Sequence, residues 1–111
     1  MERENLIEWL QEKIDGVNHD LLMDMKVKKE GVIPHGDRNK SWLKSIKERR
    51  AGWKEIIGKV NSDLSLSMDE IEKWLLAEKD MIEVKKKESG RKIAFEDTYA
   101  YIYCDKYLRW I

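Results

Sequence analysis

The hydrophobic pattern changes its period within residues 67–95, and this change constrains the fold more than any other feature of the sequence. From Ser67 to Asp80, apolar residues recur every three or four positions, as they do on one face of a helix. From Met81 onward large apolar residues recur every second position, Ile82 and Val84 in "MIEVKK" and Ile93 and Phe95 in "RKIAF", and these two segments flank the turn-like "ESG". The stretch therefore predicts a helix followed by a β-hairpin with a basic tip.

A capping box marks the start of this helix. The Ser67 hydroxyl can accept a hydrogen bond from the Glu70 amide, and the Glu70 carboxylate can accept one from the Ser67 amide. Ile71, Trp74 and Leu75 then form the apolar stripe. We expect the helix to begin directly after Ser67.

The remaining residues predict a mainly α-helical single domain. Gly16 ends a first helix and Asn18 caps a second, so that residues 1–38 form a helical hairpin, whose last residues, 31–38, are a loop that holds the only proline and separates this part from the next. Asn39 or Ser41 caps the next helix, which Gly52 interrupts, and Asp97 or Thr98 caps a last helix. Residues 39–111 thus form a second part, with one β-hairpin and a C-terminal helix.

The order of segments in residues 53–111 resembles the winged-helix (helix-turn-helix) superfamily. "WKEIIGKV" matches its second helix, "SDLSLS" its turn, "MDEIEKWLLAEKD" its third helix, and "MIEVKKKESGRKIAF" its strand, wing and strand. The likeness is loosely to the small winged-helix segment of RecD-like helicases and to phage and plasmid replication proteins. It implies a third helix in the DNA major groove, a wing on the backbone, and dimerisation through the added C-terminal helix.

Charge is balanced overall but uneven along the chain. There are 22 basic and 22 acidic residues, whereas a dedicated nucleic-acid binder is usually basic. Residues 40–60 nevertheless hold seven basic against two acidic residues, and the predicted wing is also basic. We expect non-catalytic DNA binding, in regulation or replication, through Lys85, Lys86, Lys87, Arg91, Lys92, Lys44, Lys47 and Arg50.

An alternative follows from the outward face of the predicted third helix. That face is acidic, and phosphates would repel it from a DNA groove. The chain could instead be a small protein-binding adaptor or inhibitor, of a kind that phages and mobile elements encode. Its partner would then contact Asp69, Glu72 and Glu78.

No motif indicates catalysis, a metal or a cofactor. The two histidines, His19 and His35, have no nucleophile beside them in a recognisable pattern, and Cys104 is expected to be a half-buried structural thiol. A single cysteine and the lack of a long apolar run predict a cytoplasmic protein without a membrane segment. On the last helix, Tyr101 is expected to face outward, opposite Tyr99, Ile102, Tyr103, Tyr107 and Trp110.

Overall fold

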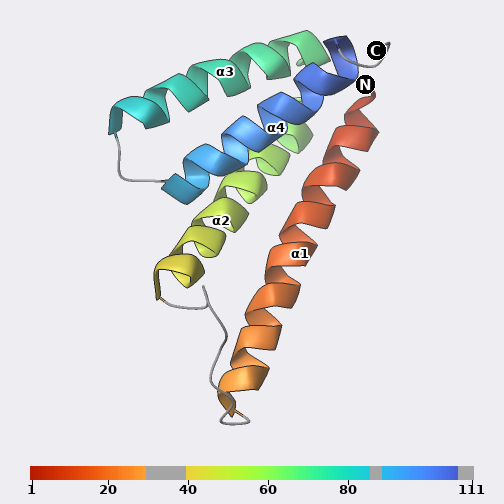
Figure 1. The fold of residues 1–111 in the computed structure, drawn as a ribbon. Coiled ribbons are helices and arrows are strands. Elements are labelled where there is room, and N and C mark those ends of the chain that lie inside the picture. Colours follow the sequence, from red (N-terminus) through yellow and green to blue (C-terminus); the bar gives the residue numbers. More distant parts are fainter. Residues whose placement is uncertain (30–39, 86–88, 108–111) are drawn as a thin grey trace.

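The computed structural model describes residues 1–29, 40–85 and 89–107 (Figure 1). This part of the chain forms four helices: α1 (Arg3–Lys29), α2 (Lys40–Ser62), α3 (Met68–Lys85) and α4 (Ser89–Tyr107). The main packing pairs are α1 with α2, α2 with α4, and α4 with α3. As Figure 1 shows, α4 crosses over α2, and α3 lies along α4 on the side away from α1.

The described residues contain no strand, so the predicted winged helix with its β-hairpin is wrong. Met81–Lys85 continue α3, and residues 91–95 belong to the first turns of α4. Ile82 lies seven residues after Leu75 and eleven after Ile71, which places all three on one helical face, and all three are buried. The short alternation in "MIEVKK" is compatible with the two-residue period of a strand and with the period of a helix. The helix forms because it buries Ile82 against the other helices.

The start of α4 depends on α2 rather than on its own sequence. Gly90, which was expected in a hairpin turn, is buried against α2, and its amide donates to Glu48 Oε2 at 3.2 Å. This carboxylate accepts from one of the amides that have no partner within the helix at its N-terminus.

The predicted caps at Asp97 and Thr98 are also wrong, because the buried Thr98 hydroxyl donates to the Ala94 carbonyl in mid-helix at 2.7 Å.

The N-terminal half is also more continuous than predicted. α1 runs unbroken through Gly16 and Asn18, so the expected pair of helices is one helix whose buried stripe is Leu6, Leu10, Ile14 and Val17. α2 likewise passes through Gly52 without interruption. The stripes of α1 and α2 provide enough apolar burial to outweigh the roughly 1 kcal/mol that each mid-helix glycine costs. The predicted cap at Asn39 and the proline loop lie outside the described residues, whereas Ser41, the alternative cap, lies inside α2, which already begins at Lys40.

The capping box at the start of α3 is confirmed. The Glu70 amide donates to Ser67 Oγ at 3.1 Å, and the Ser67 amide donates to Glu70 Oε1 at 3.3 Å. The preceding connection is held from α1, because the Arg3 guanidinium donates to the Val60 carbonyl at 2.5 Å and to the Leu66 carbonyl. The polar turn between α2 and α3 is thus fixed at both ends.

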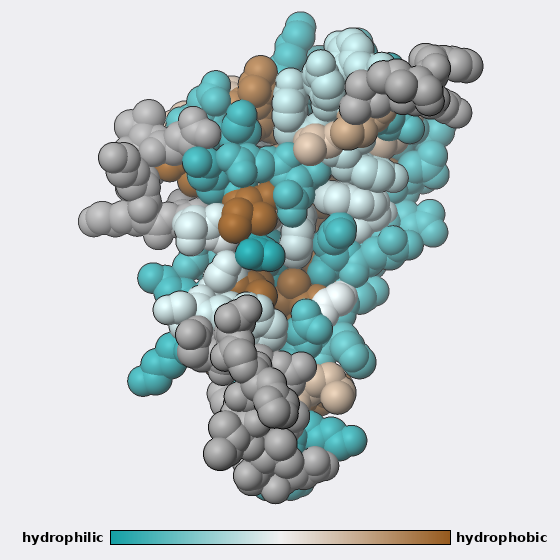
Figure 2. Space-filling view, in the orientation of Figure 1, coloured by the Kyte–Doolittle hydropathy of each residue, from teal (hydrophilic) through white to brown (hydrophobic). Residues whose placement is uncertain are grey.

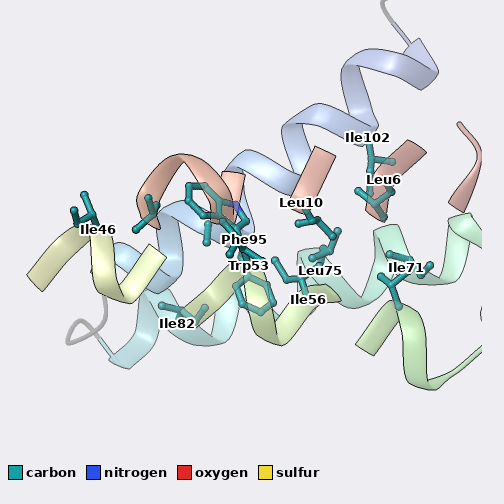
Figure 3. Packing of buried hydrophobic residues seen from close by; sticks show 14 residues of the cluster. Leu6, Leu10, Ile46, Trp53, Ile56, Ile71, Leu75, Ile82, Phe95 and Ile102 are labelled. Atoms are coloured by element: carbon teal, nitrogen blue, oxygen red, sulfur yellow. The ribbon is translucent and has the colours of Figure 1, made fainter. Parts of the chain in front are cut away.

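One apolar cluster lies between the four helices. Figure 3 shows it extending from Ile46 at one end to Ile71 and Ile102 at the other, with Trp53, Phe95 and Leu10 between them. Trp9, Trp42 and Trp74, on α1, α2 and α3, are half-buried and pack against this cluster.

Three expectations for the C-terminal helix are wrong. Tyr101 is not turned outward: it stacks on Trp9 of α1, with ring centroids 4.5 Å apart and planes 9° from parallel. Tyr103 and Tyr107, which were expected on the face opposite an outward Tyr101, are exposed, and so is Cys104, which was expected to be half-buried. α4 faces α2 with its small residues, so its buried face centres on Ala94, Thr98 and Ile102, and Tyr103 and Tyr107 lie outside it.

Candidate functional site

The residues of the expected wing do not form one surface. Lys85 ends α3, and Lys86 and Lys87 lie outside the described residues. Arg91 and Lys92 are on α4 and take part in ion pairs with carboxylates of the chain itself. The structure therefore does not show Arg91 and Lys92 as free phosphate ligands.

Arg91 links three helices. Its Nε and Nη2 atoms donate to the two carboxylate oxygens of Glu55 on α2, both at 2.8 Å. Nη2 also lies 3.5 Å from Glu78 on α3, and the guanidinium covers the Phe95 ring at 4.9 Å from its centroid. A two-bond guanidinium–carboxylate pair fixes orientation as well as charge, so Arg91 has a structural role.

The basic residues of α2 are arranged differently. Lys44 and Lys47 are exposed, and they share one face with Lys40 and Lys54 at helical spacings of three, four and seven residues. Among the described residues no ion pair involves any of these four lysines, which we call the lysine row. Small exposed residues, Ala51 and Gly58, lie on the same face.

Arg50 does not belong to the lysine row. It is half-buried, and its Nη1 atom donates to Asn18 Oδ1 on α1 at 2.8 Å. The predicted site thus named one residue that joins α1 to α2, and it did not name Lys40 and Lys54, although both lie within the basic stretch of residues 40–60. The signal that could have found them was the same helical period, followed across Gly52.

The acidic residues assigned to a protein partner are engaged within the chain. Lys106 of α4 reaches back to the start of α3, where its Nζ atom lies 2.9 Å from Asp69 Oδ1 and 3.2 Å from Glu72 Oε2. These contacts raise the pKa of Lys106, the Asp69 hydrogen bond contributing most, and the Lys106 hydrogen bond lowers the pKa of Asp69 below 3.8. Glu78, the third residue assigned to a protein partner, forms an ion pair with Arg91.

Two shallow cavities lie on either side of Lys106, between the start of α3 and the end of α4. The first has a volume of about 280 Å³ and is lined in part by Met68, Ile102 and Asp105. The second has a volume of about 260 Å³ and is lined in part by Leu76 and Tyr107. Asp69, Glu72 and Lys106 line both cavities, so we call the two together the α3–α4 cleft.

The described residues show no arrangement typical of catalysis. His19 is exposed on α1, and His35 lies outside the described part of the chain. Cys104 is exposed and is on α4, away from His19 on α1. No group of three histidine, cysteine or acidic side chains that could hold a metal ion occurs within residues 1–29, 40–85 and 89–107.

Comparisons with protein-family models, curated proteins and solved structures return no match. In the part of the chain that the structure covers, no helix has the length and apolarity needed to cross a membrane. Figure 2 shows one face of the molecule, where hydrophilic residues predominate and hydrophobic ones form small separate patches. The candidate sites are therefore two charged surfaces, the lysine row and the α3–α4 cleft.

Proposed function

We propose that this chain is a non-catalytic protein that binds the phosphate backbone of nucleic acid through the lysine row of α2. The observation that carries the proposal is that four exposed lysines, none of them in an ion pair among the described residues, lie together on one face of α2. Arg3, Arg91 and Lys106 hold the fold together through hydrogen bonds and ion pairs. The lysine row has no such role among the described residues, and its side chains are exposed.

The position of the lysine row on α2 supports a role other than helix stability. Lys40 and Lys44 lie in the first two turns of α2, and the first turn holds no acidic residue. The N-terminus of a helix carries partial positive charge, so a cation there destabilises the helix by roughly 0.3–1 kcal/mol. The same arrangement concentrates positive potential, which attracts anions.

The length of the row favours a polyanion over a small anion. From Lys40 to Lys54 the helix rises roughly 21 Å, whereas a single phosphate can contact only one or two lysines at once. A nucleic-acid strand presents a phosphate at every nucleotide, and the small side chains at Ala51 and Gly58 let a backbone approach the helix closely. Lysine ammonium groups act as point charges, so we expect little dependence on base sequence.

Other faces of the molecule oppose wrapping by nucleic acid. Glu4, Glu8, Glu12 and Asp15 form an exposed acidic row on α1 at the same helical spacing. This row accounts for part of the zero net charge of the chain. It would repel phosphates and confine the contact to the side of α2. A wider role in regulation or replication stays a prediction.

The test is a fluorescence-anisotropy titration against a labelled random duplex and a labelled single strand. Contacts from four lysines predict a slope of log K against log salt of about −3 to −4, which is a loss on the order of 100-fold in affinity between roughly 50 and 200 mM salt. The double variant Lys44→Glu with Lys47→Glu should reduce the magnitude of that slope by about 2.

The matched control is Lys13→Glu with Lys73→Glu, which changes net charge equally at exposed positions on α1 and α3. It should keep most of the binding. Equal loss in both double variants would show that net charge alone governs binding and would overturn the assignment to α2. An absence of binding by the wild-type protein at the lower salt concentration would overturn the proposed function.

A further inference from the structure

Two rows of opposite charge face the solvent on the packed pair α1 and α2. The lysine row lies on α2, and the acidic row of α1 consists of Glu4, Glu8, Glu12 and Asp15. Among the described residues no ion pair joins the two rows to each other or to any other group. Asp15 accepts a hydrogen bond from Gln11 at 2.9 Å, but this side chain is neutral. The charge of both rows is therefore available to another molecule.

Nearby groups of opposite sign do not neutralise either row. The two glutamates in the same stretch of α2, Glu48 and Glu55, are bound to residues of α4. On α1, Lys13 Nζ lies 5.2 Å from the centroid of the Trp9 ring, which stacks against α4 and not against α2. The acidic row thus stays acidic as a surface, and the lysine row stays basic.

The two rows share one spacing. The acidic row contains a triplet at intervals of four and three residues, Glu8, Glu12 and Asp15. The lysine row contains a triplet at the same intervals, Lys40, Lys44 and Lys47. Each triplet extends roughly 10 Å along its helix. When α1 of one copy lies parallel to α2 of another, each carboxylate of the first triplet faces one ammonium group of the second, and no like charges are opposed.

We propose that the lysine row docks on the acidic row of a second copy of this chain, with the two helices parallel. Charge complementarity selects this occupant, because every copy carries both surfaces and the zero net charge does not keep copies apart. The contact is heterologous, since a row on α1 meets a row on α2. Exposed ion pairs are individually weak, so the self-association should be weak and sensitive to salt.

The same lysines cannot contact a second copy and a phosphate backbone at once. In Figure 1, α1 and α2 run in roughly opposite directions within one copy, and each row lies on the exposed side of its own helix. Self-association would therefore compete with the nucleic-acid binding proposed above. It does not depend on that function, because it is measured on the protein alone, so either proposal can fail while the other stands.

The experiment is sedimentation velocity of the wild-type protein from about 10 μM to about 1 mM, in roughly 30 mM and 500 mM salt. The sedimentation coefficient should rise with concentration in low salt, and the association constant should fall on the order of 10-fold in high salt. Lys44→Glu with Lys47→Glu should abolish the rise, and so should Glu12→Lys with Asp15→Lys. No rise for the wild-type protein, or an equal rise at both salt concentrations, would overturn the proposal.

A charge swap separates row pairing from net charge. The two double variants combined in one chain exchange the signs of two facing pairs and return the net charge to zero, so self-association should be restored. The matched control combines Glu12→Lys and Asp15→Lys with Lys13→Glu and Lys73→Glu, which also gives zero net charge at exposed positions but leaves the pairs mismatched. It should stay monomeric, and equal behaviour of the two quadruple variants would refute docking of one row on the other. Circular dichroism verifies that each variant keeps its helix content.

Discussion

Gly52 of α2 faces Ala94 of α4 so closely that a Cβ atom at position 52 would stand 2.7 Å from the Cβ of Ala94. The neighbouring crossing is equally tight, since a Cβ at Gly90 would stand 2.5 Å from the Cβ of Glu48. Real Cβ atoms keep a larger distance, so the two helices would have to separate. Glycine at these two positions therefore sets the separation of α2 and α4.

Gly52→Ala should destabilise the protein by about 1–3 kcal/mol, the range for overpacking a close-fitting core. The matched control is Gly58→Ala on the same helix, where nothing lies within 4 Å of the added atom. That substitution should stabilise by about 0.5–1 kcal/mol, because alanine favours helix over glycine. Urea unfolding monitored by circular dichroism measures both. A stabilised Gly52→Ala variant would contradict the close crossing.

The second prediction concerns the ion pair between Arg91 and Glu55. A double-mutant cycle with alanine at both positions should give a coupling energy of about 1 kcal/mol, since the pair is bidentate and the arginine side chain is only 22% exposed. The comparison cycle is Lys92 with Glu96, a pair four residues apart on α4, for which about 0.3–0.5 kcal/mol is expected. A smaller coupling for Arg91 than for Lys92 would refute the bridging role.

The role of Arg91 shows which features the sequence could and could not predict. The capping box from Ser67 to Glu70 was predicted correctly, because all of its atoms lie within four consecutive residues. The partner of Arg91 lies 36 residues away on another helix. No local pattern separates such an arginine from a free one, so it was assigned to nucleic acid together with Lys44 and Lys47.

The β-hairpin error has the same physical origin. Residues 81–95 contain short alternations that fit a strand, and "ESG" fits a turn. The deciding contacts are tertiary: Ile82 and Phe95 are buried in the common core, and Gly90 is bonded to Glu48 of α2. By contrast, the exposure of Lys44 and Lys47 follows from helical period alone. Their assignment to nucleic acid stays a prediction.

The third prediction concerns Arg3, which binds the end of α2. Its guanidinium donates to the Val60 and Leu66 carbonyls and, at 3.3 Å, to those of Asp63 and Leu64. The Val60 carbonyl is one of those that the end of a helix leaves without a partner, and the other three carbonyls belong to the connection between α2 and α3. Arg3→Ala should therefore cost about 1–3 kcal/mol of unfolding free energy.

Arg3→Lys should recover only part of that loss, because an ammonium group cannot reach several carbonyls in the fixed geometry of a guanidinium. The exposed neighbour Asn5 provides the control, and Asn5→Ala should change stability by less than about 0.5 kcal/mol. Chemical unfolding of the four proteins gives the comparison. Full recovery in Arg3→Lys would show that charge, rather than hydrogen-bond geometry, is what the α2–α3 connection requires.

The last prediction is a pH dependence of opposite sign at two aspartates. Burial raises the pKa of Asp97 above 3.8, with Arg49 and Lys13 opposing the rise, whereas the Ser65 hydroxyl lowers the pKa of Asp63. A raised pKa in the folded state means that ionisation of Asp97 reduces stability as pH rises through that region. Asp97→Asn should therefore be more stable than wild type near about pH 7 and lose this advantage below the ordinary pKa.

Asp63→Asn should be less stable near about pH 7, with the difference vanishing as pH falls through the lowered pKa. Urea midpoints at about pH 7 and about pH 3 measure both differences, and the same sign for the two variants at neutral pH would contradict the assignment.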